Sequence, residues 1–565
     1  MATLPVLSLL GYGLLSLSLT RAMWATPSER SLAENPHDEV LLEWFLARTA
    51  HAVGQLDFSL ITPLMNAPRG VNLMANASII APGVAVAPIT MLFGPAVSFV
   101  LLLTLGPALT AWTTCLVLRR FVYNPGAAVV GGLVFGFCPA MIAQSLAHLH
   151  MTLAFLVPLI LLQVYELVTS SGSPIPPALR LAGLTVVQIF IGEEWLFIAA
   201  ILATAALVCA AACRPREVPR VAGRLLKGGG LAVGVVLVVV GYPLWIQFAG
   251  PGSVVGSPFL FDAFSMDLKS YVLPSSLQRF GSAADKARSL SLRGGRTEQN
   301  AAMGWPFLVV VGAAVVALRR RLLVRVAAGA ALILAVLSLG PALLVENKAT
   351  GVGLPWGLVA HRRVFESALP TRFAFAIYLL IALILALAVD HVTRHPPAVS
   401  VAPLTAILVS LLLISPLPLA AVEETPVPSY FEEAVRRDVP EDSTVLVVPV
   451  PTPQNVEPMR WQMAAGLRFR MVGGFYLGPG PDRRAFFTPV NRNTQSTLIK
   501  IHQGDPYPPL DPATRADAAA DIGYWNPSHV ILGPSPKQAE LLAYLTGVIG
   551  RPPRESGGVL VWALR

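Results

Sequence analysis

Apolar segments of membrane-spanning length follow one another along most of the chain, separated by short polar stretches. The first runs from residue 3 to residue 20, and a long polar stretch follows it. A helix needs about 20 apolar residues to cross the hydrocarbon core of a bilayer. The pattern therefore predicts about eleven membrane-spanning helices. The predicted spans are residues 3–20, 96–118, 126–143, 149–168, 180–192, 195–213, 228–248, 303–318, 323–341, 372–391 and 399–420.

The last part of the chain has a different pattern, with more charged residues and frequent prolines. Short β-branched runs predict strands, and helical patterns lie between them. Strands that alternate with helices are typical of a small α/β domain. We therefore predict a transmembrane domain at 1–421 and a soluble α/β domain at 422–565. The predicted strands are 444–449, 529–532 and 558–562, and the predicted helices are 429–438, 512–521 and 535–548.

Composition supports an integral membrane protein. Of the 565 residues, 54% are hydrophobic and only 13% are charged, whereas soluble proteins carry about 25% charged residues. The net charge of +9 does not indicate nucleic-acid binding, because no basic stripe with interleaved aromatic residues is present. The four cysteines lie in apolar runs and form neither a metal motif nor a disulfide framework.

The basic residues set the orientation. Arginine and lysine gather in short loops such as 119–125, 214–227 and 319–322, and such loops face the cytoplasm. The loops at 22–95 and 342–371 then face outward, as do loop 249–302 and the C-terminal domain. We expect a plasma-membrane protein with an extracytoplasmic C-terminal domain. A signal peptide is the competing interpretation of residues 3–20, but the run lacks a basic start, which favours a retained helix.

Four separate outer segments bring ionisable residues to this outer face. Such residues are costly near the apolar layer, so function is the default hypothesis for them. Plainer explanations remain: solvated loop acids, an amphipathic surface helix at 38–53, helix caps and interfacial anchors. Adjacent glutamates between two apolar runs are the hardest to explain without a partner cation. The candidates are Asp38, Glu39, His51, His148, His150, Glu193, Glu194, Arg362, Arg363 and Arg372.

A first span followed by a long outer loop with an acidic pair, Asp38-Glu39, and juxtamembrane helices resembles the polytopic C-type (GT-C) glycosyltransferases. More narrowly, the chain is similar to uncharacterised actinobacterial membrane glycosyltransferase-like proteins. That similarity covers most of the chain but carries little information about activity. The matching segments are 67–76, 136–150, 354–358, 369–373 and 468–475.

The resemblance implies a transferase that takes its sugar from a polyprenyl-phosphate donor in the surrounding membrane lipids. Asp38 would be the general base that deprotonates the acceptor hydroxyl, with inversion at the anomeric carbon. The acceptor would be an extracytoplasmic glycan, lipid or protein of the cell envelope. The negative charge of the leaving phosphate could be met by a divalent cation, Mg²⁺ or Mn²⁺, or by arginines. The candidates for the cation are Glu39, Glu193 and Glu194, and those for the phosphate are Arg362, Arg363 and Arg372.

Two other classes remain open. A transporter or flippase of lipid-linked glycans would place ionisable groups near the middle of the bilayer and would show interrupted helices in matched halves. A non-catalytic envelope scaffold would use its tail to bind glycan. The sequence favours the transferase, because its acids cluster at one face and no matched halves are evident.

Overall fold

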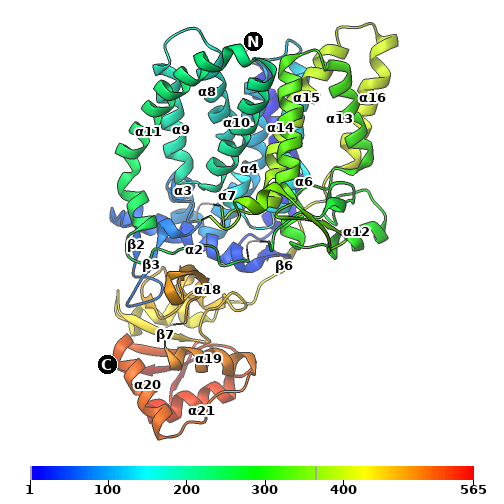
Figure 1. Cartoon of the computed structure of the whole chain (residues 1–565). Coiled ribbons are helices and arrows are strands. Elements are labelled where there is room, and N and C mark those ends of the chain that lie inside the picture. The colour runs from blue at the N-terminus through cyan, green and yellow to red at the C-terminus, as the bar shows by residue number, and fades with distance from the viewer. Residues whose placement is uncertain (1–2, 261, 363–364, 491, 565) are drawn as a thin grey trace.

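In a computed structural model, a bundle of upright helices forms one end of the molecule and a small domain of strands and helices forms the other (Figure 1). The structure describes residues 3–260, 262–362, 365–490 and 492–564. The N-terminus lies at the far end of the bundle, away from the C-terminal domain. The chain therefore enters at one end of the bundle and finishes beyond the other.

Apolar helices make up the bundle. By length and composition, five of the helices in the described ranges can cross a membrane, namely α1, α4, α10, α11 and α15. The chain is thus a multi-pass membrane protein, while the count of about eleven spans stays a prediction. The bundle helices are α1 (Thr3–Trp24), α3 (Ile80–Phe93), α4 (Pro95–Leu118), α5 (Pro125–Gly136), α6 (Pro139–Gln144), α7 (Leu149–Thr152), α8 (Val157–Thr169), α9 (Ile175–Ile189), α10 (Glu194–Cys213), α11 (Val218–Phe248), α13 (Gly304–Leu318), α14 (Leu322–Ser338), α15 (Phe373–Val392) and α16 (Pro397–Leu413).

Several predicted span boundaries differ from the structure. The predicted span 126–143 is two helices, α5 and α6, because Pro139 cannot continue a helix but suits the first turn of a new one. The predicted span 149–168 likewise divides into α7 and α8. The predicted outer loop 22–95 contains an apolar helix, α3, that the prediction did not identify as a separate apolar segment.

The helix that begins the candidate site, α2 (Pro36–Gln55), lies at the end of the bundle that faces the C-terminal domain (Figure 1). Pro36 occupies its first turn, and the Asn35 side chain caps it by accepting a hydrogen bond from the Asp38 backbone N–H. Just before it, β1 (Arg30–Leu32) pairs antiparallel with β6 (Ala421–Glu423). This pairing ties the start of the first outer loop to the chain that leaves the bundle.

The C-terminal domain is built on a mixed five-stranded sheet with the order β12-β13-β11-β7-β8. The predicted strands at 444, 529 and 558 are present as β7 (Thr444–Val448), β11 (His529–Leu532) and β13 (Val559–Ala563), so an α/β tail is confirmed. The other elements of this domain are η7 (Tyr430–Ala434), α17 (Val435–Asp438), α18 (Glu457–Ala464), β8 (Arg470–Met471), β9 (Leu477–Pro479), η8 (Pro481–Arg483), β10 (Ala485–Phe487), α19 (Asn493–Gln503), α20 (Pro512–Trp525), α21 (Gln538–Ile549) and β12 (Arg554–Ser556).

The connections on the side of the C-terminal domain carry short elements. These are β2 (Ile61–Thr62), β3 (Val71–Asn72), η1 (Leu73–Ala75), η3 (Leu268–Tyr271), α12 (Ala283–Leu290), η4 (Arg296–Glu298), β4 (Ala342–Val345), β5 (Lys348–Gly353), η5 (Pro355–Leu358) and η6 (Pro370–Arg372), and η2 (Pro215–Glu217) precedes α11.

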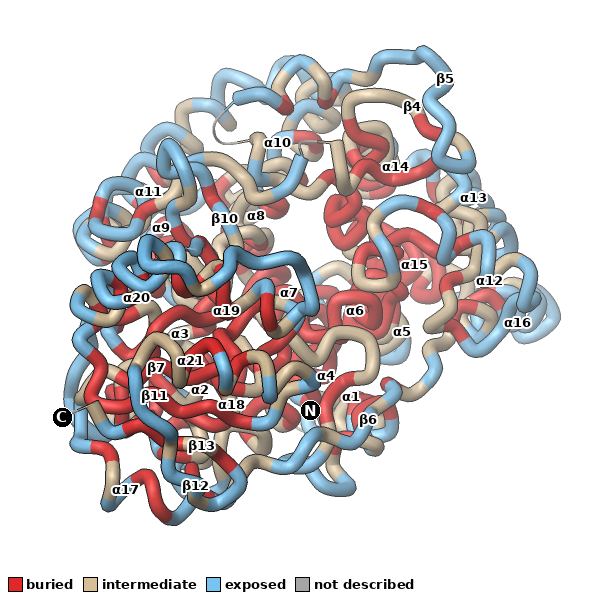
Figure 2. The backbone as a smooth tube through the Cα atoms, turned by 90° about the horizontal axis from the view of Figure 1, so that it is seen from below, coloured by how far each residue is buried: buried red, intermediate tan, exposed pale blue. Residues whose placement is uncertain are grey.

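Buried residues run through the middle of the molecule (Figure 2). One hydrophobic cluster includes residues of α2, the bundle helices and the near part of the C-terminal domain. A second cluster lies within the C-terminal domain, where one face of the sheet packs against α19 and α21. Because the first cluster is shared, the near face of the C-terminal domain packs against α2 as part of a continuous core.

Candidate functional site

Asp38 lies in the first turn of α2, where the helix dipole favours a negative charge. Asn35 Nδ2 donates to Asp38 Oδ2 at 2.7 Å, and His148 Nε2 lies 3.5 Å from the same oxygen. Burial alone would raise the pKa of Asp38, but hydrogen bonding and charge from His148, together with Asn35, lower it below its ordinary value. Asp38 is therefore a carboxylate at neutral pH.

The side chain of Gln144 orients the ring of His148. Gln144 Nε2 donates to Thr297 O at 2.7 Å and to Asn300 Oδ1 at 3.1 Å, which fixes the amide and leaves its Oε1 as an acceptor. This oxygen is 2.7 Å from His148 Nδ1, so Nδ1 carries a hydrogen. The contact from Nε2 to Asp38 is then attractive when Nε2 carries a proton too.

His150 follows on the short helix α7. Its Nδ1 is buried without a hydrogen-bond partner among the described residues. His150 therefore has a polar atom that the described residues leave unused.

A buried ion cluster lies beside the two histidines. Arg372 donates from Nη2 to Glu298 Oε1 at 2.6 Å and from Nε to the same oxygen at 3.0 Å, while its Nη1 donates to Glu194. Thr371 Oγ1 and Asn300 Nδ2 donate to Glu298 Oε2 at 3.0 and 2.8 Å. Burial acts to raise the pKa of Glu298, but the charge and hydrogen bonds of Arg372 outweigh it and lower that pKa below its ordinary value. Two carboxylates thus share one guanidinium in a buried setting.

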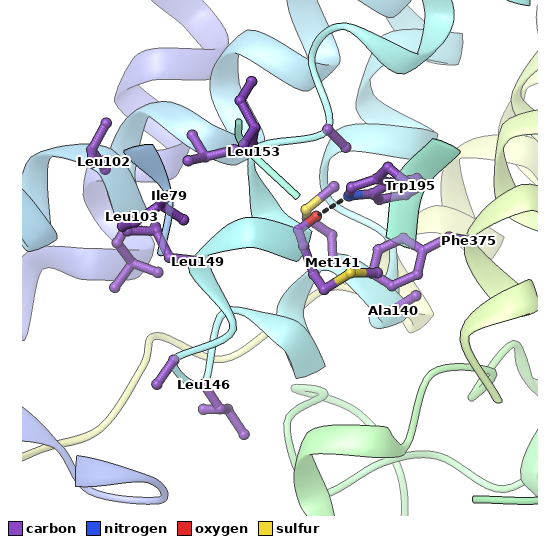
Figure 3. Packing of buried hydrophobic residues seen from close by; sticks show 14 of the residues in the cluster. Ile79, Leu102, Leu103, Ala140, Met141, Leu146, Leu149, Leu153, Trp195 and Phe375 are labelled. Carbon is purple, nitrogen blue, oxygen red and sulfur yellow. Dashed lines mark hydrogen bonds between the residues drawn. The ribbon is translucent and has the colours of Figure 1, made fainter. Parts of the chain in front are cut away.

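Aromatic packing fixes the helices that carry this cluster (Figure 3). Trp195, which follows Glu194, stacks edge to face with Phe375 of α15 with ring centroids 4.8 Å apart. Its Nε1 donates to Met151 O of α7 at 2.9 Å. This contact set holds the first turns of α10 and α15 against the histidine turn, which places Glu194 beside Arg372.

These side chains surround a cavity of about 450 Å³, which we call the Asp38 cavity. It lies between α2, the turn around α7, the start of α10, the loop before α15 and the first strands after β8. Its ionisable residues are Asp38, His148, His150, Glu194, Glu298 and Arg372, with Asn35, Asn76 and Thr297 as neutral polar neighbours. The structure brings together five of the candidates predicted from sequence, namely Asp38, His148, His150, Glu194 and Arg372.

A second cavity of about 320 Å³, the Glu193 cavity, shares part of its wall with the first. Gln247 of α11 donates from Nε2 to Glu193 Oε2 at 2.5 Å in this wall. Burial raises the pKa of Glu193 to about 6, although the bond from Gln247 acts in the opposite direction. The lining residues common to both cavities are Ala75, Asn76, Ala77, His150, Glu194 and Ser367.

Glu39 lies on another face of α2 from Asp38. Successive residues on a helix point about 100° apart, so Asp38 faces the cavity with Leu41 and Leu42 while Glu39 does not line it. Glu39 Oε2 accepts from the Leu32 backbone N–H at 2.6 Å. Burial and the neighbouring Glu43 raise the pKa of Glu39 well above its ordinary value, and Arg460 of α18 acts against this shift. Glu39 therefore belongs to the contact with the C-terminal domain.

The remaining candidates do not reach the two cavities. His51 lies near the end of α2 and Arg362 is exposed, and neither lines a cavity wall. Arg363 lies outside the described residues. Of the acids that were candidates for a cation, Glu193 and Glu194 line one cavity together, whereas Glu39 lines neither cavity. Across the ranges that the structure describes, no group of three or more His, Cys, Asp or Glu side chains is arranged to hold a metal ion.

Sequence reasoning missed Glu298, Gln144, Asn300 and Gln247. Glu298 looks like an ordinary acid of a long outer loop, and only the fold shows that it is buried against Arg372. Arg372 was the one indication in the sequence, because an arginine that opens an apolar span needs a carboxylate partner. The amides carry no signal in a single sequence, since their role is to orient His148 and Glu193.

The fold is similar to that of a solved glycosyltransferase. The arabinofuranosyltransferase AftD from Mycobacteria superposes with a TM-score of 0.55 at 16% identity, covering 99% of this chain and 40% of that one. The oligosaccharyltransferase AglB from Archaeoglobus fulgidus matches with a TM-score of 0.49 at 12% identity, over 94% of this chain and 69% of that one. The chain thus spans about 40% of the length of AftD.

The resemblance to the polytopic C-type glycosyltransferases is confirmed at the level of the fold, and the molecule is a multi-pass membrane protein of that architecture. A family model described as "Domain of unknown function (DUF6311)" matches residues 10–414. The chain belongs to this family. A search of curated proteins finds no match.

Proposed function

We propose that this protein is a membrane glycosyltransferase that moves a sugar from a polyprenyl-phosphate donor to an acceptor hydroxyl, with inversion. The observation that carries the proposal is the Asp38 cavity. It combines an ionised carboxylate, a histidine in contact with that carboxylate and a buried arginine in about 450 Å³. The fold of AftD, an arabinofuranosyltransferase, supports the same class of reaction.

Asp38 is the general base in this proposal. Its low pKa keeps it ionised at neutral pH, and a weak base suffices when the proton leaves the acceptor late. The acceptor oxygen forms a bond to the anomeric carbon from the side opposite the phosphate, and its proton passes to Asp38. The bond from the anomeric carbon to the phosphate oxygen breaks, and the electron pair leaves with the polyprenyl phosphate.

The leaving phosphate needs positive charge. Arg372 already compensates two carboxylates, and of these Glu298 is also held by Thr371 and Asn300. We therefore assign Glu194 as the partner that a phosphate exchanges with, and His148 as the second positive group. A divalent cation, Mg²⁺ or Mn²⁺, stays a candidate for the same task. Glu194 lines both cavities and Glu193 lines the Glu193 cavity beside it, so these two acids are the candidates to hold it.

The site lies at the bundle end on which the C-terminal domain packs (Figure 1). We propose that this end is extracytoplasmic, in the plasma membrane of an actinobacterial cell, and that the acceptor belongs to the cell envelope. The charged cavity residues lie at the beginnings of helices: Asp38 in α2, Glu194 in α10 and Arg372 just before α15. This placement supports a transferase over a flippase, which needs ionisable groups deeper in the bilayer.

The test is sugar transfer by the purified protein in proteoliposomes. A first donor is polyprenyl-phosphate arabinose with radiolabelled sugar, and a panel of other polyprenyl-phosphate pentoses and hexoses follows it. We expect transfer to arabinan or mannan oligosaccharides, and Asp38→Asn should lower it by about 10³-fold or more, in the range of lost general base catalysis. Asp57→Asn, an exposed acid beyond the same helix, is the matched control. Equal activity of Asp38→Asn and the wild type would remove Asp38 from the reaction.

A further inference from the structure

The Glu193 cavity contains polar atoms that the proposed transfer step does not use. Glu193 and Gln247 bind each other through Oε2 and Nε2, and this leaves Glu193 Oε1 and Gln247 Oε1 buried without a hydrogen-bond donor among the described residues. His150 Nδ1, on the wall shared with the Asp38 cavity, is likewise buried and unpartnered there. An unmade hydrogen bond of a buried group is destabilising, so such a cluster indicates a missing ligand group.

The unpartnered atoms define the chemistry of that group. An amide oxygen and a carboxylate oxygen accept hydrogen bonds and cannot donate them, while His150 has its Nδ1 left to donate or to accept one. The terminal torsions of glutamate and glutamine side chains are broad, so a small rotation brings either oxygen to the cavity surface. The occupant must therefore offer several hydrogen-bond donors that face the wall formed by α10, α11 and the α7 turn.

The charge of the lining excludes an anionic occupant. Glu193 and Glu194 line this cavity, and no arginine or lysine is among its described lining residues. Arg372 lines the Asp38 cavity instead. A phosphate is thus directed to the Asp38 cavity, and a neutral group with many hydroxyls suits the Glu193 cavity. Its volume of about 320 Å³ is at the small end of ligand sites, in keeping with one sugar ring.

We infer that the Glu193 cavity is a sugar-binding subsite in which Glu193, Gln247 and His150 receive the hydroxyls of an uncharged sugar ring. The wall that it shares with the Asp38 cavity, including His150 and Glu194, sets this ring next to the reacting centre. The ring has two sources, the sugar of the donor or the terminal sugar of the acceptor. Naming either source rests on the proposed transferase function, whereas binding of a sugar does not.

The first experiment measures binding alone. Methyl α-arabinofuranoside and methyl α-mannoside are titrated into the purified protein in nanodiscs, with tryptophan fluorescence or calorimetry as the readout. Gln247→Leu and Glu193→Leu should each weaken the bound glycoside by about tenfold, the effect of losing one or two hydrogen bonds. Gln163→Leu is the matched control, because Gln163 lines neither cavity and bonds to Arg180 instead. Equal affinity in the wild type and both cavity variants would overturn the inference.

A second variant covers the case in which the buried substitutions do not fold. Ser367 is exposed and lines both cavities, so Ser367→Trp should block the subsite by bulk without disturbing the core. A folded Ser367→Trp protein that binds both glycosides as tightly as the wild type would equally contradict the subsite.

Steady-state transfer assays separate the two sources. If the acceptor sugar occupies the subsite, Gln247→Leu raises KM for the oligosaccharide acceptor by about tenfold and leaves KM for polyprenyl-phosphate arabinose unchanged. The reverse pattern assigns the subsite to the donor sugar. If glycoside binding depends on Gln247 but no sugar transfer is detected, the sugar-binding subsite is supported and the proposed transferase function is refuted. Transfer with unchanged constants in Gln247→Leu would keep the transferase and refute the subsite.

Discussion

Oδ2 of Asp38 lies 3.5 Å from Nε2 of His148. The contact joins the first outer loop to the turn between α6 and α8, two segments that are 110 positions apart in the sequence but share one cavity. His148 is itself fixed by Gln144, so the pair is pre-oriented before a substrate arrives. A carboxylate held in this way has a pKa that depends on its histidine neighbour.

Replacing His148 with glutamine should move the acid limb of the pH-rate profile to higher pH. Hydrogen bonding and charge from His148 lower the pKa of Asp38 against the effect of burial. Without the histidine, burial dominates and the pKa of Asp38 rises, so the base becomes protonated at a pH where the wild type is still active. The measurement is kcat/KM between pH 4 and pH 8. A profile of unchanged shape in His148→Gln would show that Asp38 is not the titrating base.

Removing the guanidinium of Arg372 should destabilise the protein strongly. Arg372→Met leaves Glu194 and Glu298 buried without their shared cation, and breaking a buried ion pair costs about 3–5 kcal/mol. Thermal unfolding in detergent, followed by tryptophan fluorescence, should show a large fall in Tm. Adding Glu298→Gln to the variant should recover part of the loss, since one of the uncompensated charges is then gone.

Arg120→Met is the comparison for that experiment. Arg120 also pairs with a glutamate, Glu166, but its side chain is 62% exposed. Exposed pairs contribute about 0–1 kcal/mol, so Tm should change little. Similar losses in the two variants would contradict a special role for the buried cluster.

The contact between α2 and the C-terminal domain should weaken as pH rises toward neutrality. Burial raises the pKa of Glu43 to about 7, while Arg460 acts in the opposite direction. A carboxyl group with a raised pKa binds its proton more tightly in the folded state, so stability is lost as pH rises from its ordinary value of 4.5 to about 7. Glu43→Gln cannot ionise and should show a flatter dependence of Tm on pH across this interval.

The relevant quantity is the difference between the variant and the wild type at each pH, because other groups titrate as well. Glu441→Gln, at an exposed glutamate of the C-terminal domain, is the matched control and should follow the wild-type curve. A Glu43→Gln curve parallel to the wild-type curve would mean that Glu43 does not hold a proton in this contact.

The sequence was sufficient for the membrane class, the α/β tail and much of the cavity. Hydropathy located α4, α10 and α15 because each carries a long apolar run between polar ends. The positive-inside rule then placed Asp38, His148, Glu194 and Arg372 at one end of the bundle. The rule depends on the number of membrane-spanning helices. The division of one predicted span at Pro139 did not change that number, because the six-residue helix α6 is too short to cross a bilayer by itself.

Side-chain directions could not be predicted in the same way. Asp38 and Glu39 form one acidic pair in the sequence, but the helix separates them, so that only Asp38 lines the cavity. Glu298 could not be identified either, because its burial depends on how loop 249–302 folds back against Arg372. Hydropathy reports which segments enter the membrane, whereas these contacts depend on the packing of distant loops.

The last prediction concerns the hydrogen bonds of Gln462, which connect α2 to the C-terminal domain. Trp44 Nε1 donates to Gln462 Oε1 at 2.7 Å, and Gln462 Nε2 donates to Leu64 O at 2.7 Å and to Phe469 O at 2.8 Å. Gln462 is fully buried and comes from α18, so it bridges the first outer loop and the C-terminal domain. Gln462→Leu leaves a donor and two acceptors buried without partners.

Each unsatisfied buried group costs about 1–3 kcal/mol, so Gln462→Leu should lower Tm and make the chain between α16 and β7 more sensitive to protease. Gln503→Leu, at the exposed end of α19, should do neither. Because α2 also carries Asp38, weaker contact between α2 and the C-terminal domain should lower kcat for sugar transfer and change the KM of either substrate less. A Gln462→Leu protein with normal Tm but reduced activity would instead place Gln462 in the site itself, and one with normal Tm and normal activity would show that α2 is positioned by the bundle alone.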